Sequence, residues 1–157
     1  MTPEQFFLKY SFPCAHVLVE MGSIDEAKLE ELKKNVLNNE IMNRGELMML
    51  FPSAFRRISE VASRMNKPVW NVDVMKRYFL EEHNDYIDKR DGNYSKFTDG
   101  FADFCKVYRG EVIHKDGDAL TVRFGERVRT VFSDILPGVV VGDKVTFHQA
   151  FAVEKVD

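Results

Sequence analysis

The sequence has little cysteine: only Cys14 and Cys105 occur among its 157 residues. The two lie far apart and form no CxxC pair, so the chain lacks the spacing of a disulfide framework or a cysteine-rich zinc site. In a reducing compartment they are expected to be free thiols or metal ligands. The simpler interpretation is that both fill space in the core, because free cysteine is among the most buried residue types.

Other features are also missing. No apolar run is long enough to span a bilayer, and the opening MTPEQFFLKY lacks the apolar stretch of a signal peptide. We therefore expect a soluble, cytoplasmic protein. A formal net charge of -3 disfavours nucleic acid as the main partner, because phosphate binding needs clustered Lys and Arg. No Ser/His/Asp set, phosphate-binding loop or zinc motif is present, so we do not expect an enzyme.

Residues 1–92 have the apolar periodicity of helices. Ser23 opens one predicted helix with a capping-box pattern, Ser53 is the expected N-cap of another, and Asn71 is the expected N-cap of a third. The first segment contains Pro13, which is expected to break the helix or to start a second one. The sequence predicts a domain built as a bundle of four or five helices.

The pattern changes after residue 92. Residues 93–104 belong to a stretch rich in Gly, Asp, Asn and Ser, which is typical of a linker. Residues 105–157 then alternate apolar and polar side chains in short runs, with Asp116-Gly117 as a hairpin turn. Short strands at close spacing predict a small antiparallel OB-like β-barrel. The expected fold class is α+β, with the helical bundle first.

The final apolar run contains His148. Alternation along one continuous strand places Val145, Phe147 and Phe151 on the core face and His148 on the opposite face. His148 is therefore expected to be exposed. Taken alone, this pattern favours a solvated surface histidine, although such a residue can also reach a ligand or a partner.

Residues 105–157 resemble the HypC/HupF family of hydrogenase maturation chaperones. Cys105 is followed five positions later by Gly110, and GEVIHKDGDALTVRFG continues the family pattern with its Asp-Gly turn. The stretch RVRTVFSDILPGVVVGDKV is similar to the family's Leu-Pro and Val-Gly-Asp segment, and FHQAFAVEKVD to its last strand. The likeness is collinear over the last third of the chain, while the helical region has no recognised counterpart.

The resemblance implies an OB-like barrel that is not an enzyme. It implies partners of two kinds, a HypD-like maturation protein and the precursor of the hydrogenase large subunit. It also implies that Cys105 and His148 transiently hold an Fe(CN)₂CO fragment, and thiolate suits such soft iron. Partner contacts are expected near Arg109, Gly110, Phe151 and Glu154.

Three further interpretations remain open. In the first, the barrel is a binding module for nucleic acid or protein without metal chemistry, which uses Arg123, Arg127 and Arg129. In the second, Cys14 and His16 share a metal, although packing is the simpler explanation. In the third, an enzyme site lies in a pocket between His83 and the barrel. The pattern around His83 favours a solvated helical face instead.

Overall fold

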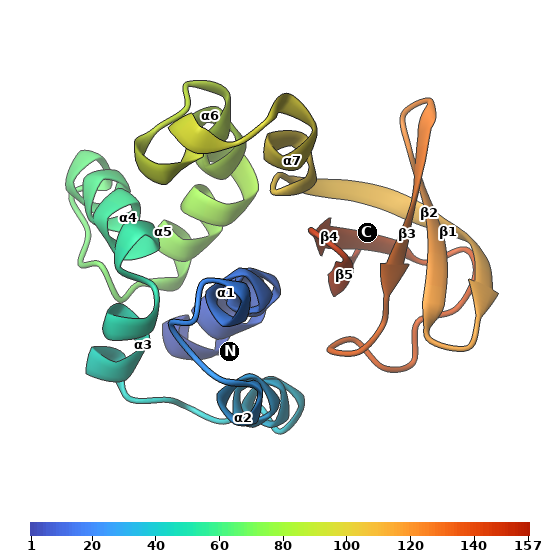
Figure 1. Ribbon diagram of the computed structural model, residues 1–157, viewed down its shortest axis with the longest axis horizontal. Coiled ribbons are helices and arrows are strands. Elements are labelled where there is room, and N and C mark those ends of the chain that lie inside the picture. The colour runs from blue at the N-terminus through green and yellow to red at the C-terminus, as the bar shows by residue number, and fades with distance from the viewer.

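A computed structural model describes residues 1–157 and contains helices followed by a closed five-stranded barrel (Figure 1). This confirms the predicted combination of a helical first part with a small β-barrel. The OB-like identity of the barrel stays a prediction. No helix has both the length and the apolar character needed to cross a membrane.

The helical half comprises residues 3–104. Its elements are α1 (Pro3–Glu20), α2 (Glu26–Leu37), α3 (Arg44–Leu50), α4 (Pro52–Met65), α5 (Val72–Lys76), the π-helical segment η1 (Arg77–Glu82), α6 (His83–Asp88), the 3-10 helix η2 (Gly92–Lys96) and α7 (Asp99–Phe104). Because α5, η1 and α6 follow one another without a break, they form one continuous helix.

The helix starts agree only in part with the expected caps. Asn71 caps α5 as predicted, since its side chain accepts from the backbone N–H groups of residues 73 and 74. Asp25, and not Ser23, caps α2. Residue 51 precedes α4 without a side-chain cap, so the expectation for Ser53 was wrong. Pro13 neither breaks nor starts a helix but lies inside α1. Packing keeps α1 continuous, because most of its side chains near Pro13 are buried.

The segment expected as a linker is folded. Residues 92–96 form η2 and residues 99–104 form α7, which Thr98 caps through its side chain. Tyr94 and Ala102 are buried in the helical core. The connection between the helical half and the barrel is therefore packed structure.

The barrel consists of β1 (Val107–Asp116), β2 (Ala119–Phe124), β3 (Arg127–Phe132), β4 (Lys144–His148) and β5 (Phe151–Val156). The strand order around the barrel is β1-β2-β3-β5-β4, and β1 pairs with both β2 and β4. All pairs are antiparallel except β3 with β5, which meet in parallel where Phe132 pairs with Phe151. Closure leaves no long free sheet edge.

The final apolar run is two strands and not one. β4 and β5 form a hairpin in which His148 pairs with Phe151 across Gln149 and Ala150. Gln149 has a φ of 55°, in the left-handed region that non-glycine residues seldom adopt. The turn and a register shift between Thr146 and Phe147 break the expected alternation, so Ala152 lies in the barrel interior.

Two hydrophobic cores hold the molecule. The larger one fills the helical half and continues through Cys105, Val107, Ile135 and Val153 onto the outer face of the barrel. The smaller core fills the barrel interior and includes Phe147. The two halves therefore share apolar packing.

Helix α1 also joins the halves through polar contacts. The Tyr10 hydroxyl lies 2.9 Å from Thr146 Oγ1 and donates to Glu154 Oε1 at 2.5 Å. Lys9 Nζ donates to the other Glu154 oxygen at 2.9 Å. In Figure 1, α1 lies near the centre of the molecule, with the barrel on one side, α3 to α6 on the other, α2 below it and α7 above it.

Candidate functional site

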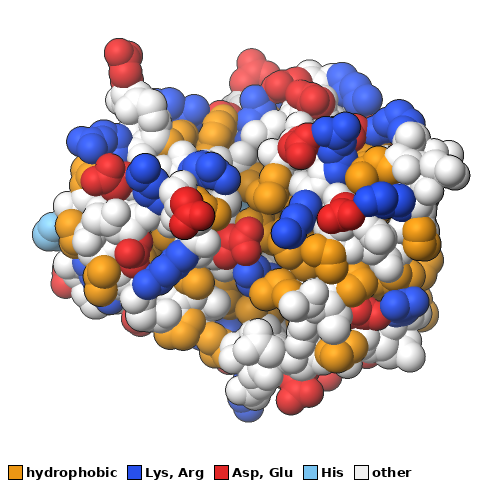
Figure 2. Space-filling model, turned by 180° about the vertical axis from the view of Figure 1, so that it is seen from behind, with side chains coloured by type: hydrophobic (Ala, Val, Ile, Leu, Met, Phe, Trp, Pro, Cys, Tyr) orange, Lys and Arg blue, Asp and Glu red, His pale blue; other side chains and the backbone are white.

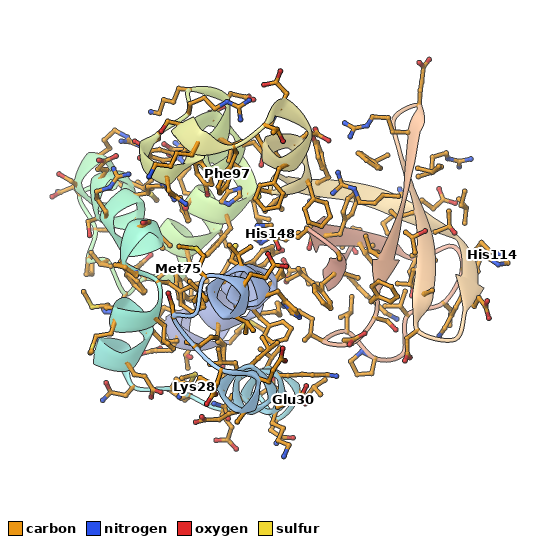
Figure 3. All side chains as sticks on the ribbon, in the orientation of Figure 1. Lys28, Glu30, Met75, Phe97, His114 and His148 are labelled. Atoms are coloured by element: carbon orange, nitrogen blue, oxygen red, sulfur yellow. The ribbon has the colours of Figure 1, made fainter.

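A cavity of about 340 Å³ lies between α1, α4, the α5–η1–α6 helix and the β4–β5 turn. Its apolar wall includes Leu18, Leu50 and Phe97. The lining also contains polar and ionisable side chains from distant parts of the chain. These are Cys14, Arg57, His83, Cys105, His148 and Gln149. Figure 3 shows His148 between the helical half and the barrel, with Phe97 above it. The sequence interpretation named a pocket between His83 and the barrel as the requirement for an enzyme site, and such a pocket is present.

His148 is buried, with 1% of its surface exposed, so the expectation of an exposed histidine was wrong. The alternation argument placed it correctly outside the barrel interior, but the helical half covers that outer face. His148 Nδ1 lies 2.7 Å from the carbonyl oxygen of Tyr10. A carbonyl can only accept, so Nδ1 carries the proton and Nε2 presents its lone pair.

The His148 Nε2 lone pair faces Cys14, whose Sγ lies 3.5 Å away. The thiol is therefore the donor of this contact. The predicted partner, Cys105, is placed differently. It is 4% exposed at the end of α7, and no hydrogen bond joins it to the imidazole ring. The structure thus brings Cys105 and His148 to one cavity, while the sulfur in contact with the ring belongs to Cys14.

Gln149 connects the two thiols. Its Nε2 lies 3.7 Å from Cys14 Sγ and 3.8 Å from Cys105 Sγ. Its side chain reaches both sulfurs from the β4–β5 turn, where its backbone is left-handed. Cys14, Cys105, His148 and Gln149 are called the thiol–imidazole cluster below.

Burial keeps the cluster uncharged. It raises the pKa of Cys14 to about 12, with a further contribution from Cys105, and raises that of Cys105 to about 11 against a smaller lowering by Gln149. Burial lowers the pKa of His148 to about 4, although its hydrogen bond to the backbone of Tyr10 acts in the opposite direction. At neutral pH the cluster therefore holds two thiols and a neutral imidazole.

His83 is a second buried histidine, with 3% of its surface exposed, so the expected solvated face was wrong. Its ring meets that of His148 edge to face, with centroids 5.0 Å apart. Burial, together with His148, holds the pKa of His83 well below its usual value. The π-helical segment η1 ends directly before His83, and such segments often occur at functional sites.

Arg57 brings a cation to the cavity wall while being only 3% exposed. Its Nε donates to Asp91 at 2.8 Å, its Nη2 donates to Asn93 at 2.9 Å, and the guanidinium stacks 4.2 Å over the Tyr94 ring. Asp91 pairs with Arg57 and also with the more exposed Arg56.

The residues expected to contact partners have different surroundings. Arg109 is exposed on β1. Phe151 and Glu154 are half-buried against the helical half, where Phe151 packs on Phe12 and Glu154 bonds to α1. Gly110 has a steric role, because an added Cβ would lie 2.5 Å from the backbone oxygen of residue 123.

The arginines of the alternative binding module are largely neutralised. Arg127 and Arg129 both pair with Asp103, and Arg123 lies 3.7 Å from Glu111. Arg129 is also covered by aromatic rings, including that of Phe147 at 5.4 Å. Figure 2 shows positive and negative side chains intermixed over the face it displays. The arginine set does not form an open basic surface.

No three His, Cys, Asp or Glu side chains converge closely enough to hold a metal in the arrangement of this structure. His16, the suggested partner of Cys14, stacks on Phe151 at 4.7 Å and bonds to the Pro13 carbonyl. His16 therefore packs in the structure, in line with the simpler of the two interpretations. The histidine that contacts Cys14 is 134 residues away, and no local spacing indicates it.

Comparisons of the sequence with protein-family models and with curated proteins found no match. The chemistry of the cavity and the motif resemblance of residues 105–157 are therefore the two indications of function.

Proposed function

We propose that the protein is an adaptor of the HypC type, which holds an iron fragment carrying cyanide and carbon monoxide during hydrogenase assembly. The observation that supports this proposal is the gathering of Cys105, His148 and Cys14 on one cavity. The iron fragment is cargo and not a resident cofactor. Transfer requires that it be held by few ligands.

The donors of the cavity suit this cargo. Low-valent iron with carbonyl and cyanide ligands is soft, and thiolate and imidazole are the protein ligands that it favours. The lone pair of His148 Nε2 is already directed into the cluster. Apolar side chains surround the cluster and keep water from competing for the iron.

Partner binding is the second part of the proposal. Arg109, at the exposed surface of β1, is assigned to contact with a HypD-like protein or with the large-subunit precursor. Because α1 covers Phe151 and Glu154, these residues support partner binding only by holding the helical half in place.

The test is capture under anaerobic conditions from cells that make a nickel–iron hydrogenase. Tagged wild-type protein should retain a HypD-like protein or the large-subunit precursor, and its infrared spectrum should show cyanide and carbonyl stretching bands. Cys105→Ala should lose the bands, whereas His114→Ala, at an exposed site on the barrel, should keep them. Capture of neither partner by the wild-type protein would reject the proposal.

A second candidate function is thiol-based catalysis, which is favoured by the contact between Cys14 Sγ and His148 Nε2. A cysteine beside an oriented histidine is the arrangement of a nucleophile with its base. The raised pKa of Cys14 argues for a slow reaction, because the thiolate is the reactive form. Alkylation of Cys14 by iodoacetamide at pH 7 faster than that of a free cysteine would support catalysis, and slower alkylation would reject it.

A further inference from the structure

The distance between Cys14 Sγ and His148 Nε2 matches the distance between two ligands of one tetrahedral metal ion. With Zn–S near 2.3 Å and Zn–N near 2.0 Å, two such ligands on a tetrahedral ion lie about 3.5 Å apart. Cys14 Sγ and His148 Nε2 are separated by 3.5 Å. These two donors therefore already have the separation of neighbouring ligands on one tetrahedral ion.

The orientation of His148 supports the same conclusion. A ligating imidazole commonly donates its other N–H to a carbonyl or carboxylate, which fixes the ring. His148 donates Nδ1–H to the Tyr10 carbonyl at 2.7 Å, and both Tyr10 and Cys14 belong to α1. Helix α1 therefore supplies a ligand atom and also the group that orients the second ligand.

The Gln149 side chain separates Cys105 from Cys14. The Gln149 amide stands between the two sulfurs, 3.7 Å from Cys14 Sγ and 3.8 Å from Cys105 Sγ. An amide N–H is a poor ligand, and it forms only weak contacts with sulfur here. Rotation of Gln149 would free the space between the sulfurs and let Cys105 approach the same ion.

We propose that Cys14 and His148 are the primary ligands of a soft transition-metal site that spans the two halves, and that Cys105 joins as a second sulfur when Gln149 turns away. Each ligating thiol releases its proton to solvent, and the ion releases coordinated water in exchange. The inference deepens the proposed function and rests on it for the identity of the natural cargo. It differs in making a cysteine of the helical half essential.

The lining of this cavity reaches the surface of the molecule. Met21 and Met49 belong to it, and these residues are 70% and 85% exposed.

The experiment is an anaerobic titration of the reduced, full-length protein with Co²⁺, followed by competition with Zn²⁺. The wild-type protein should bind one equivalent and show a sulfur-to-cobalt charge-transfer band with the intense visible bands of tetrahedral Co²⁺. Cys14→Ser should weaken binding at least about 100-fold, because a primary ligand is lost. Gln149→Ala should keep the site, because the amide is not a ligand.

His114→Ala, at an exposed position outside the cavity, is a control and should bind like the wild type. Cys14→Ala serves as a second variant, and near-ultraviolet circular dichroism should show that both Cys14 variants are folded. Absence of the charge-transfer band in the wild type, or unchanged binding by folded Cys14→Ser, would overturn the inference. So would selective loss of binding in Cys105→Ser alone.

Different experimental results would reject the adaptor function and the metal site. If the wild-type protein captures maturation partners but does not bind Co²⁺, the metal-site inference is wrong and the adaptor function stands. If it binds Co²⁺ through Cys14 but captures no partner, the site stands and the hydrogenase role is wrong.

Discussion

The buried, neutral His148 should make the protein lose stability in mild acid. Its pKa is about 4 in the folded protein, against 6.5 for an ordinary histidine. Between these values the unfolded chain takes up a proton that the folded protein does not, so the free energy of unfolding falls as the pH decreases from about 6.5 to 4. Above pH 6.5 this contribution is fully present.

The size of the effect follows from the shift. A difference of this size corresponds to about 3 kcal/mol in total at about 1.4 kcal/mol per pKa unit. Between pH 7 and pH 5 the loss from His148 alone should be about 2 kcal/mol. His83 acts in the same direction, because burial also lowers its pKa.

The assay is urea unfolding at pH 7 and pH 5, followed by circular dichroism, for the wild type and for His148→Gln. Glutamine does not titrate, so the variant should lose about 2 kcal/mol less than the wild type over this range. His114→Gln, at an exposed position, should behave like the wild type. An equal pH dependence in the wild type and His148→Gln would refute the conclusion that this imidazole is buried and neutral.

Three further predictions concern the packing around the site, each measured by urea unfolding at pH 7. Gly110→Ala should cost about 3 kcal/mol or more, because its Cβ would lie 2.5 Å from a backbone oxygen of the neighbouring strand. Gly100→Ala, in α7 with open space around it, should be neutral or stabilising by up to about 1 kcal/mol, and equal effects of the two changes would contradict the steric explanation. Asp103→Asn should cost about 1–3 kcal/mol, because it leaves the half-buried Arg129 without its carboxylate, and a loss below about 0.5 kcal/mol would count against this role. Tyr10→Phe should cost about 1–2 kcal/mol, because its hydroxyl joins α1 to the barrel, and unchanged stability would mean that these bonds do not hold the interface.

Local sequence patterns were enough to predict which part of the chain is helical and which part forms strands. The helical spacing before residue 92, the Asn71 cap and the period of two after residue 105 depend on neighbours in sequence, and the structure confirms them. Local rules failed where packing outweighs propensity. Pro13 stays within α1 because the helix is held by its buried side chains, and Gln149 makes a tight turn without the glycine that would have indicated one.

The site itself was only partly predictable. Resemblance to a known motif pointed to Cys105 and His148, and both line the cavity. The burial of His148 and its contact with Cys14 arise from α1, which lies more than 130 residues away in the sequence. Arg57 was missed for the same reason, and His83 was expected on a solvated face although it is buried. A single sequence without related chains contains no information about such long-range pairs.

The π-helical segment has an evolutionary consequence. A π turn accommodates one extra residue within an α-helix, so η1 is what a single-residue insertion into the α5–α6 helix would leave behind. Removing that residue would restore a plain helix and rotate the residues after it by about 100°. His83 would then turn away from His148. The insertion or deletion of a single codon would therefore be enough to form or remove the contact between the two imidazole rings.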